Sequence, residues 1–201
     1  MLVTILDHSF TYHNEISSIE PCLVQIEEIL NANDVSLVLM EINGVEVYEG
    51  FQAFLIEHIQ EIEHVHIKVQ TEKQMMETLV ITMKQYLEDA LPEVKKLGDE
   101  FYQGASKTSW DKLTQLLEGT AWIVQSVQKI QTEEQFQNCE AYIETSRSLH
   151  AELSNLEEAL KNEDLVLTGD ILKYEIVSIF EQLLQTVTHT IDNEVKSHDL
   201  S

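Results

Sequence analysis

The residues whose types and spacing could bind a metal gather in one short stretch, HIQEIEHVHI, residues 58–67. Two of its histidines, His64 and His66, are separated by one residue, and Glu61 precedes them. Imidazole nitrogens and carboxylate oxygens are common ligands of zinc. If residues 63–70 form a strand, both histidines point to the same face, as two ligands of one ion would. The stretch is therefore a candidate metal site built from His64, His66 and Glu61.

A solvent-exposed strand face explains the same stretch with fewer requirements. Lys68 continues the face that carries the two histidines, which would place a cation beside any bound ion. Zinc takes four protein ligands, or three protein ligands and a water, whereas the stretch supplies only two histidines that are certain to share a face. The spacing from Glu61 to His64 is an E-x-x-H pattern, but a di-iron bundle needs that pattern on two helices. We therefore favour the exposed strand face over the metal site.

Catalytic motifs are not found in the sequence. It contains no G-x-S-x-G, no phosphate-binding loop and no G-x-G-x-x-G. Neither Cys22 nor Cys139 has an adjacent basic residue that would activate its thiol. Acidic pairs such as Glu157-Glu158 are neighbours in the sequence, so on a helix they point about 100° apart and form solvated faces. The sequence predicts neither an enzyme nor a cofactor.

The charge of the chain restricts its partners. Asp and Glu number 36 against 12 Lys and Arg, which gives a formal net charge of -24. Nucleic-acid binding requires cations that displace counterions from phosphates, and anionic membranes attract basic segments. We therefore expect no nucleic acid and no membrane among the partners. The acidity suits a solvated surface, and it would attract a basic protein.

The location expected from the sequence is the cytoplasm. The N-terminus has no basic region followed by an apolar stretch, and no apolar run reaches the length of about 20 residues that spans a bilayer. The two cysteines form no C-x-x-C pair and lie far apart, which argues against a structural disulfide.

Residues 1–70 are predicted to form a small α+β module. VSLVLMEINGVEVY, residues 35–48, has two β-rich runs around Asn43-Gly44, a pair typical of a type I′ hairpin turn. TILDHSFTY resembles MEINGVEVY at an offset of 36, which would place the first turn at Asp7-His8. A helix is expected after each hairpin and a strand after the second helix. The predicted order is ββα-ββα-β.

Residues 71–201 have helical periodicity and are predicted to form a four-helix bundle. Pro92 should bend or interrupt the first helix, and Thr132 to Gln135 form a capping box at the start of the third. Gly169 falls within the last helix, where glycine costs about 1 kcal/mol against alanine, so we expect a close helix–helix approach there. The fold class expected for the whole chain is α+β.

Three stretches are similar to segments of an uncharacterised family of small acidic proteins from Gram-positive bacteria. They are EINGVEVYEGFQAFLIEHIQEIEHVHIKVQT, EDLVLTGDILKYEIVSIFEQLL and, more faintly, LTQLLEGTAWIVQ. The resemblance covers residues 41 to about 184 and implies the same division into a small module and a helical domain of unknown function. It implies no activity and no site residues.

The leading functional hypothesis is a cytoplasmic, non-enzymatic protein-interaction or regulatory module that binds a protein partner or self-associates. One alternative is a metal-binding protein or metal-dependent enzyme that uses His64 and His66. Another is a chaperone for an exported or aggregation-prone partner, whose amphipathic helix an acidic bundle could shield.

Overall fold

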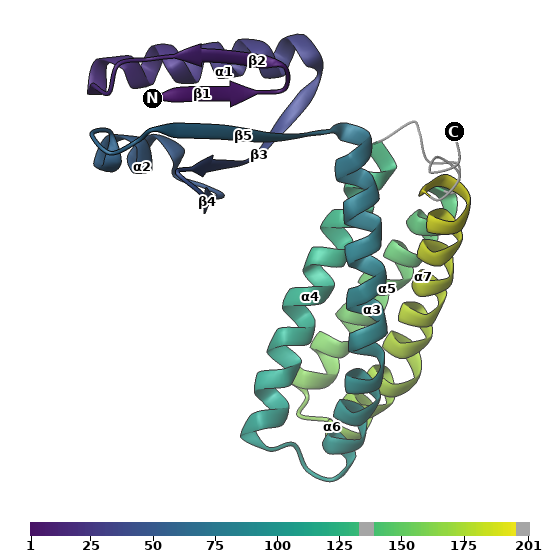
Figure 1. Ribbon diagram of the computed structural model, residues 1–201. Coiled ribbons are helices and arrows are strands. Elements are labelled where there is room, and N and C mark those ends of the chain that lie inside the picture. The colour runs from purple at the N-terminus through teal and green to yellow at the C-terminus, as the bar shows by residue number, and fades with distance from the viewer. Residues whose placement is uncertain (133–138, 196–201) are drawn as a thin grey trace. The chain divides into compact units, whose positions relative to one another are not determined.

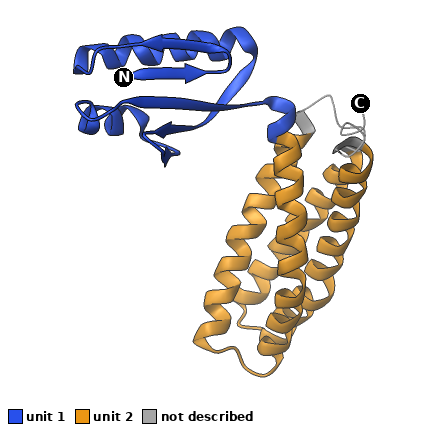
Figure 2. Ribbon diagram, in the orientation of Figure 1, with its two compact units in different colours: residues 1–75 blue, residues 76–201 orange. Residues whose placement is uncertain are grey.

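The computed structural model describes residues 1–132 and 139–195, and it divides into two compact units (Figures 1 and 2). Unit 1 is Met1–Met75 and unit 2 is Met76–Ser201. The first contains a five-stranded sheet and the second is helical. The α+β fold class is therefore confirmed, and the division lies slightly beyond the boundary expected after residue 70.

Unit 1 follows the predicted ββα-ββα-β order. Its elements are β1 (Leu2–Ile5), β2 (His8–Thr11), the short 3-10 turn η1 (Ile16–Ser18), α1 (Ile19–Asn33), β3 (Val35–Ile42), β4 (Val45–Val47), α2 (Phe51–His58) and β5 (His64–Thr71). The strand order in the sheet is β2-β1-β5-β3-β4. β1 and β5 are parallel at the centre, while the other neighbours are antiparallel. Strand β5 lies between β1 and β3 and thus joins the two hairpins into one sheet.

The core of unit 1 lies on one face of this sheet. Val65 and Ile67 alternate with His64 and His66 along β5, and only the two aliphatic side chains are buried. Apolar side chains of α1, of α2 and of the residue after α2 pack on the buried face, and they include Ile19, Cys22, Ile26, Leu55 and Ile59. The opposite face carries the polar side chains of His64, His66 and Lys68 on β5, and the register places the apolar Leu2 and Leu39 beside them.

The two hairpin turns differ. Asn43 and Gly44 have φ values of 49° and 84°, so the second hairpin has the expected type I′ turn. In the first hairpin Ile5 pairs with His8, so the turn is at Leu6-Asp7 and the expected position at Asp7-His8 is wrong. Leu6 has a φ of 50°, a left-handed conformation that is unusual for a bulky side chain.

Asn43 also fixes the segment that leads into β5. Its side-chain carbonyl accepts hydrogen bonds from the backbone N–H groups of Glu63 (2.9 Å) and His64 (3.0 Å). Its side-chain amide donates to the carbonyl oxygen of Glu61 at 2.8 Å. One turn residue therefore holds three backbone groups before the central strand begins.

We expect Asn43→Gly to destabilise unit 1 by about 1 kcal/mol, because glycine tolerates the positive φ but removes all three side-chain hydrogen bonds. Amide hydrogen exchange along β5 measures the change as faster exchange. Asn43→Asp retains the acceptor and loses only the donor, so its exchange rates should lie between those of wild type and Asn43→Gly. Equal rates in all three proteins would contradict this role.

The described residues of unit 2 form four helical segments around one apolar core, in agreement with the predicted bundle. They are α3 (Glu72–Tyr102), whose first turn belongs to unit 1, α4 (Lys107–Thr132), α5 (Cys139–Lys161) and a last segment made of α6 (Leu165–Asp170), a π-helical stretch η2 (Ile171–Ile176), α7 (Val177–Thr190) and a second π-helical stretch η3 (Ile191–Val195). α3 continues through Pro92 without interruption. The capping box predicted at residues 132–135 lies outside the described residues, apart from the last residue of α4. In the described part of the chain, no helix is long and apolar enough to cross a membrane.

A close helix crossing joins α3 to α6, as expected from Gly169. A Cβ atom added to Gly169 would lie 3.0 Å from the carbonyl oxygen of Gly98, and one added to Gly98 would lie 3.1 Å from the carbonyl oxygen of Gly169. Both glycines are buried. Each backbone therefore occupies the place where a side chain of the other helix would stand, which explains a glycine inside each helix.

Candidate functional site

The predicted metal-site residues are only partly brought together. His64 and His66 are exposed on the same face of β5, and Nδ1 of His66 lies 2.9 Å from Oγ1 of Thr4 on the neighbouring strand β1. Glu61 lies in the loop before β5, where its backbone carbonyl accepts a hydrogen bond from the side-chain amide of Asn43. Within residues 1–132 and 139–195, no three His, Cys, Asp or Glu side chains group closely enough to hold a metal ion.

Beside the histidines, the open sheet face carries an ion-paired network centred on Lys68. Its ammonium group lies 3.0 Å from Glu46 and 3.3 Å from Glu41, and the Tyr48 hydroxyl donates to Glu46 at 2.7 Å. The hydrogen bonds from Tyr48 and Lys68 lower the pKa of Glu46, and its carboxylate raises the pKa of Lys68. The cation expected beside the histidines is thus present, and two carboxylates neutralise it.

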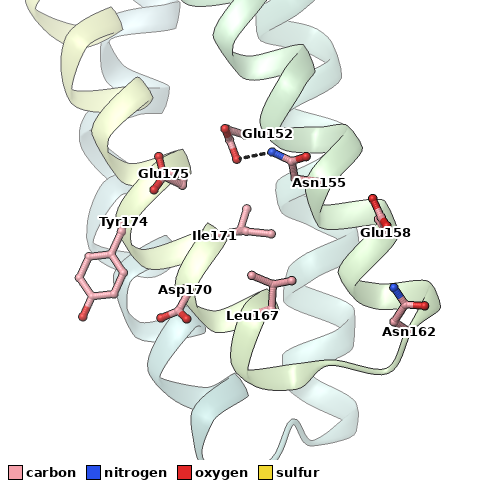
Figure 3. A pocket seen from close by; sticks show the side chains of 9 residues that line it. All are labelled: Glu152, Asn155, Glu158, Asn162, Leu167, Asp170, Ile171, Tyr174 and Glu175. Carbon is pink, nitrogen blue, oxygen red and sulfur yellow. Dashed lines mark hydrogen bonds between the residues drawn. The ribbon is translucent and has the colours of Figure 1, made fainter.

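A groove in unit 2 is a stronger candidate for a binding site (Figure 3). It has a volume of about 790 Å³ and lies between α5 and the α6–η2 segment. Glu152, Asn155, Glu158 and Asn162 line one wall at the spacing of one helix face. Leu167, Asp170, Ile171, Tyr174 and Glu175 line the other. Each wall is therefore a single helix surface.

The groove is acidic and has an apolar floor. Its lining includes the carboxylates of Glu152, Glu158, Asp170 and Glu175, and none of its described lining residues is a lysine, arginine or histidine. Among the described residues, Glu158 and Glu175 form no ion pair with a cation, whereas Glu152 accepts a hydrogen bond from Asn155 at 3.0 Å. Leu167 belongs to the α6–η2 wall and has an exposed fraction of 44% (Figure 3). The arrangement can attract cations and cover aliphatic groups.

Contacts with α3 hold the α6–η2 wall in place. The Tyr102 hydroxyl donates to Asp170, and this hydrogen bond raises the pKa of Tyr102 to about 12. Lys173, which does not line the groove, donates a hydrogen bond from its ammonium group to Asp99 on α3 at 2.5 Å. These contacts flank the Gly98–Gly169 crossing described above. The shape of the groove thus depends on the docking of α3 against this segment.

The N-terminal end of the same wall is fixed by a helix cap. The side chain of Asp164 accepts a hydrogen bond from the backbone N–H of Leu167 at 2.9 Å, which satisfies one free donor of the first turn. The π-helical turn that follows changes the spacing of the side chains after Gly169. It lies directly beside the groove, where such turns are often found near functional sites.

Sequence reasoning did not find this groove. The sequence assigns Glu158 to a solvated acidic face, and it contains no pattern that pairs the surface of α5 with that of the α6–η2 segment. Val166 and Leu167 are apolar in the sequence, but their exposed fractions of 61% and 44%, which exclude them from the core, are known only from the structure. Their relation to the acidic helix follows once α5 is known to be the neighbour.

Comparison with known proteins gives one match. Residues 78–186, more than half of the chain, match the family model described as a domain of unknown function, DUF8042. The match includes all the residues that line the groove and both glycines of the crossing. It agrees with the resemblance of the sequence to a family with an uncharacterised helical domain. No curated protein and no solved structure matches the chain.

Proposed function

Since the chain belongs to the DUF8042 family, whose domain has no assigned function, we propose that it is a non-enzymatic interaction module that binds a basic segment of a partner protein in the groove between α5 and the α6–η2 segment. The observation that carries this proposal is the lining of four carboxylates without a cation, above an apolar floor.

The groove suits lysine and arginine side chains in particular. Their charged ends would approach Glu158 and Glu175, while their aliphatic stems would cover Leu167. The net charge of -24 adds a long-range attraction that speeds the encounter with a basic partner. Binding should therefore weaken as the salt concentration rises, because both contributions are screened.

We also propose that this module acts in the cytoplasm. Cys22 is buried and unpaired, and burial raises its pKa to about 11. A buried free thiol of this kind is stable in a reducing compartment. Labelling of the intact protein in cell fractions would test the location.

The double variant Glu158→Gln/Glu175→Gln should weaken binding of a synthetic lysine- and leucine-containing helical peptide about tenfold at low salt, since it removes two of the four groove charges. Fluorescence anisotropy of the labelled peptide gives the dissociation constant.

A matched control separates the groove from the overall charge. Asp111→Asn/Glu118→Gln removes two exposed carboxylates of α4, which do not line the groove, and changes the net charge equally. We expect its affinity to fall by less than about threefold. Equal losses in the two double variants would mean that the peptide responds to net charge alone, and the proposal would then be wrong.

A further inference from the structure

Part of one edge of strand β3 in unit 1 pairs with no other strand of the sheet. β4 pairs only with its last residues, from Met40↔Val47 to Ile42↔Val45 (Figure 1). On the other side β5 pairs with β3 from Val35 to Ile42, with a shift of register between Leu37 and Leu39. On the β4 side, Val35–Leu39 therefore meets no strand in the described part of the chain. Alternate residues of such an edge direct backbone N–H and C=O groups outward, where they can pair with another chain.

An apolar groove runs beside this edge. It has a volume of about 500 Å³ and lies between β3, α1 and the first turn of α2. Leu37 of β3, Leu23 and Leu30 of α1, and Phe51 of α2 line it, and all four are only partly buried. A free strand edge beside a partly exposed apolar groove is the arrangement that receives an added strand in peptide-binding domains.

We propose that an extended basic peptide from another protein adds to β3 along Val35–Leu39. Its backbone continues the sheet, and every second side chain enters the groove beside Leu37 and Leu30. This site goes beyond the proposed function, since it lies on the other unit and recognises an extended strand.

Charge selects a basic peptide over a second copy of this chain. Unit 1 contains thirteen Asp and Glu residues and only two lysines, and Lys68 is already paired with Glu41 and Glu46. Glu27 lies in the groove lining. A second copy would bring the same negative charge to the edge, whereas lysines on the outward positions of a peptide would be attracted.

A peptide of alternating lysine and valine tests the proposal with the full-length protein. Its valines share one face in an extended strand, while a peptide of the same composition with the valines in one block has no such face. We expect the alternating peptide to bind at least about tenfold more tightly than the block peptide. It should also slow amide hydrogen exchange within Val35–Leu39, because the outward N–H groups become bonded.

Two tryptophan variants of α2 locate the site. Ala53 is exposed and lines the groove, so Ala53→Trp should fill it and weaken the alternating peptide at least about tenfold. Ile56 is an exposed position of the same helix outside the groove lining, and Ile56→Trp should leave the affinity unchanged.

Three results with the peptides would overturn the proposal: no binding of the alternating peptide, equal affinity for the block peptide, or exchange protection elsewhere than β3. Protection of β3 that depends on protein concentration without peptide would also overturn it, because the occupant would then be a second copy. The groove variants of α5 and η2 should not affect this peptide, so the two proposals can fail separately.

Discussion

Gly169→Ala should destabilise unit 2 by about 2 kcal/mol, although alanine is the better helix former by about 1 kcal/mol. The added methyl group would lie 3.0 Å from the Gly98 carbonyl oxygen and 3.0 Å from Cε1 of Tyr102. The first of these atoms belongs to the backbone, so α3 and α6 must move apart. Urea unfolding followed by tryptophan fluorescence measures the effect on this unit, because Trp110 and Trp122 are the only tryptophans.

A double-mutant cycle shows whether the loss comes from the crossing. Gly98→Ala should cost a similar amount, since its Cβ would lie 2.9 Å from Cβ of Lys173. The double variant should cost less than the sum, because helices already separated by one methyl group accept the second more easily. Ala141→Gly, at an exposed position of α5, calibrates the helix-propensity contribution. Stabilisation by Gly169→Ala would show that the crossing tolerates a side chain.

The order of elements in unit 1 could be predicted because its signals are local. Asn43-Gly44 specifies a turn by its own conformational preferences, and the alternation around Val65 specifies a strand face. The first turn could not be placed to the residue. Ile5↔His8 is equivalent to Ile42↔Val45, so the two hairpins are offset by 42 − 5 = 37 residues and not by 36. Leu6 gives no turn signal, since its left-handed conformation is imposed by strand pairing.

The helices of unit 2 were predictable, but their inward faces were less so. Helical spacing places Trp110 and Leu117 on the same apolar stripe as Leu113, yet their exposed fractions are 41% and 38%. Thr120 and Ile123 are buried. A buried threonine breaks the apolar pattern, and its hydroxyl is satisfied by donating to the carbonyl oxygen of Leu116 at 2.7 Å. Hydrophobic periodicity counts only apolar residues and therefore misses a buried threonine. The inward face that it predicts for α4 is rotated relative to the face that is buried in the structure.

Both candidate binding sites depend on which segments become neighbours. The acidic groove needs Glu158 and Glu175 on facing helices, although they are 17 positions apart in sequence. The free edge of β3 exists because β4 is only three residues long and pairs only with the end of β3. The sequence of β3 itself does not indicate how long its neighbour is. By contrast, His64 and His66 are separated by one residue on a single strand. The sequence alone therefore brings them together as candidate metal ligands.

Gly119→Ala should destabilise unit 2 by about 3 kcal/mol, the largest effect that we expect from a single methyl group. The ring of Tyr86 on α3 lies directly over Gly119 on α4. A Cβ atom there would lie 1.9 Å from the Tyr86 hydroxyl oxygen and 2.4 Å from Cζ. The whole ring must therefore move, and it would lose its edge contacts with Trp122 (5.8 Å between centroids) and Phe180 (6.5 Å). Urea unfolding measured by tryptophan fluorescence again gives the change.

The displaced ring has space to occupy, so the variant should still fold. Tyr86 lines a groove of about 280 Å³ between α3 and α4, into which it can rotate. Burial raises the pKa of Tyr86 above its ordinary value of 10.0, so wild-type stability from this group is complete below pH 10 and declines as the pH rises through the higher value. Exposure in Gly119→Ala should return this pKa toward 10.0, and an absorbance titration compared with Tyr86→Phe would isolate it.

Removing the ring should reverse the sign of the substitution. In a Tyr86→Leu background the space over Gly119 is no longer filled by the aromatic ring, so Gly119→Ala should cost nothing or stabilise by about 1 kcal/mol through helix propensity. Tyr86→Leu alone should destabilise through the lost contacts with Trp122 and Phe180. A Gly119→Ala penalty that persists in the Tyr86→Leu background would mean that α4 itself, and not the ring of Tyr86, requires glycine at this position.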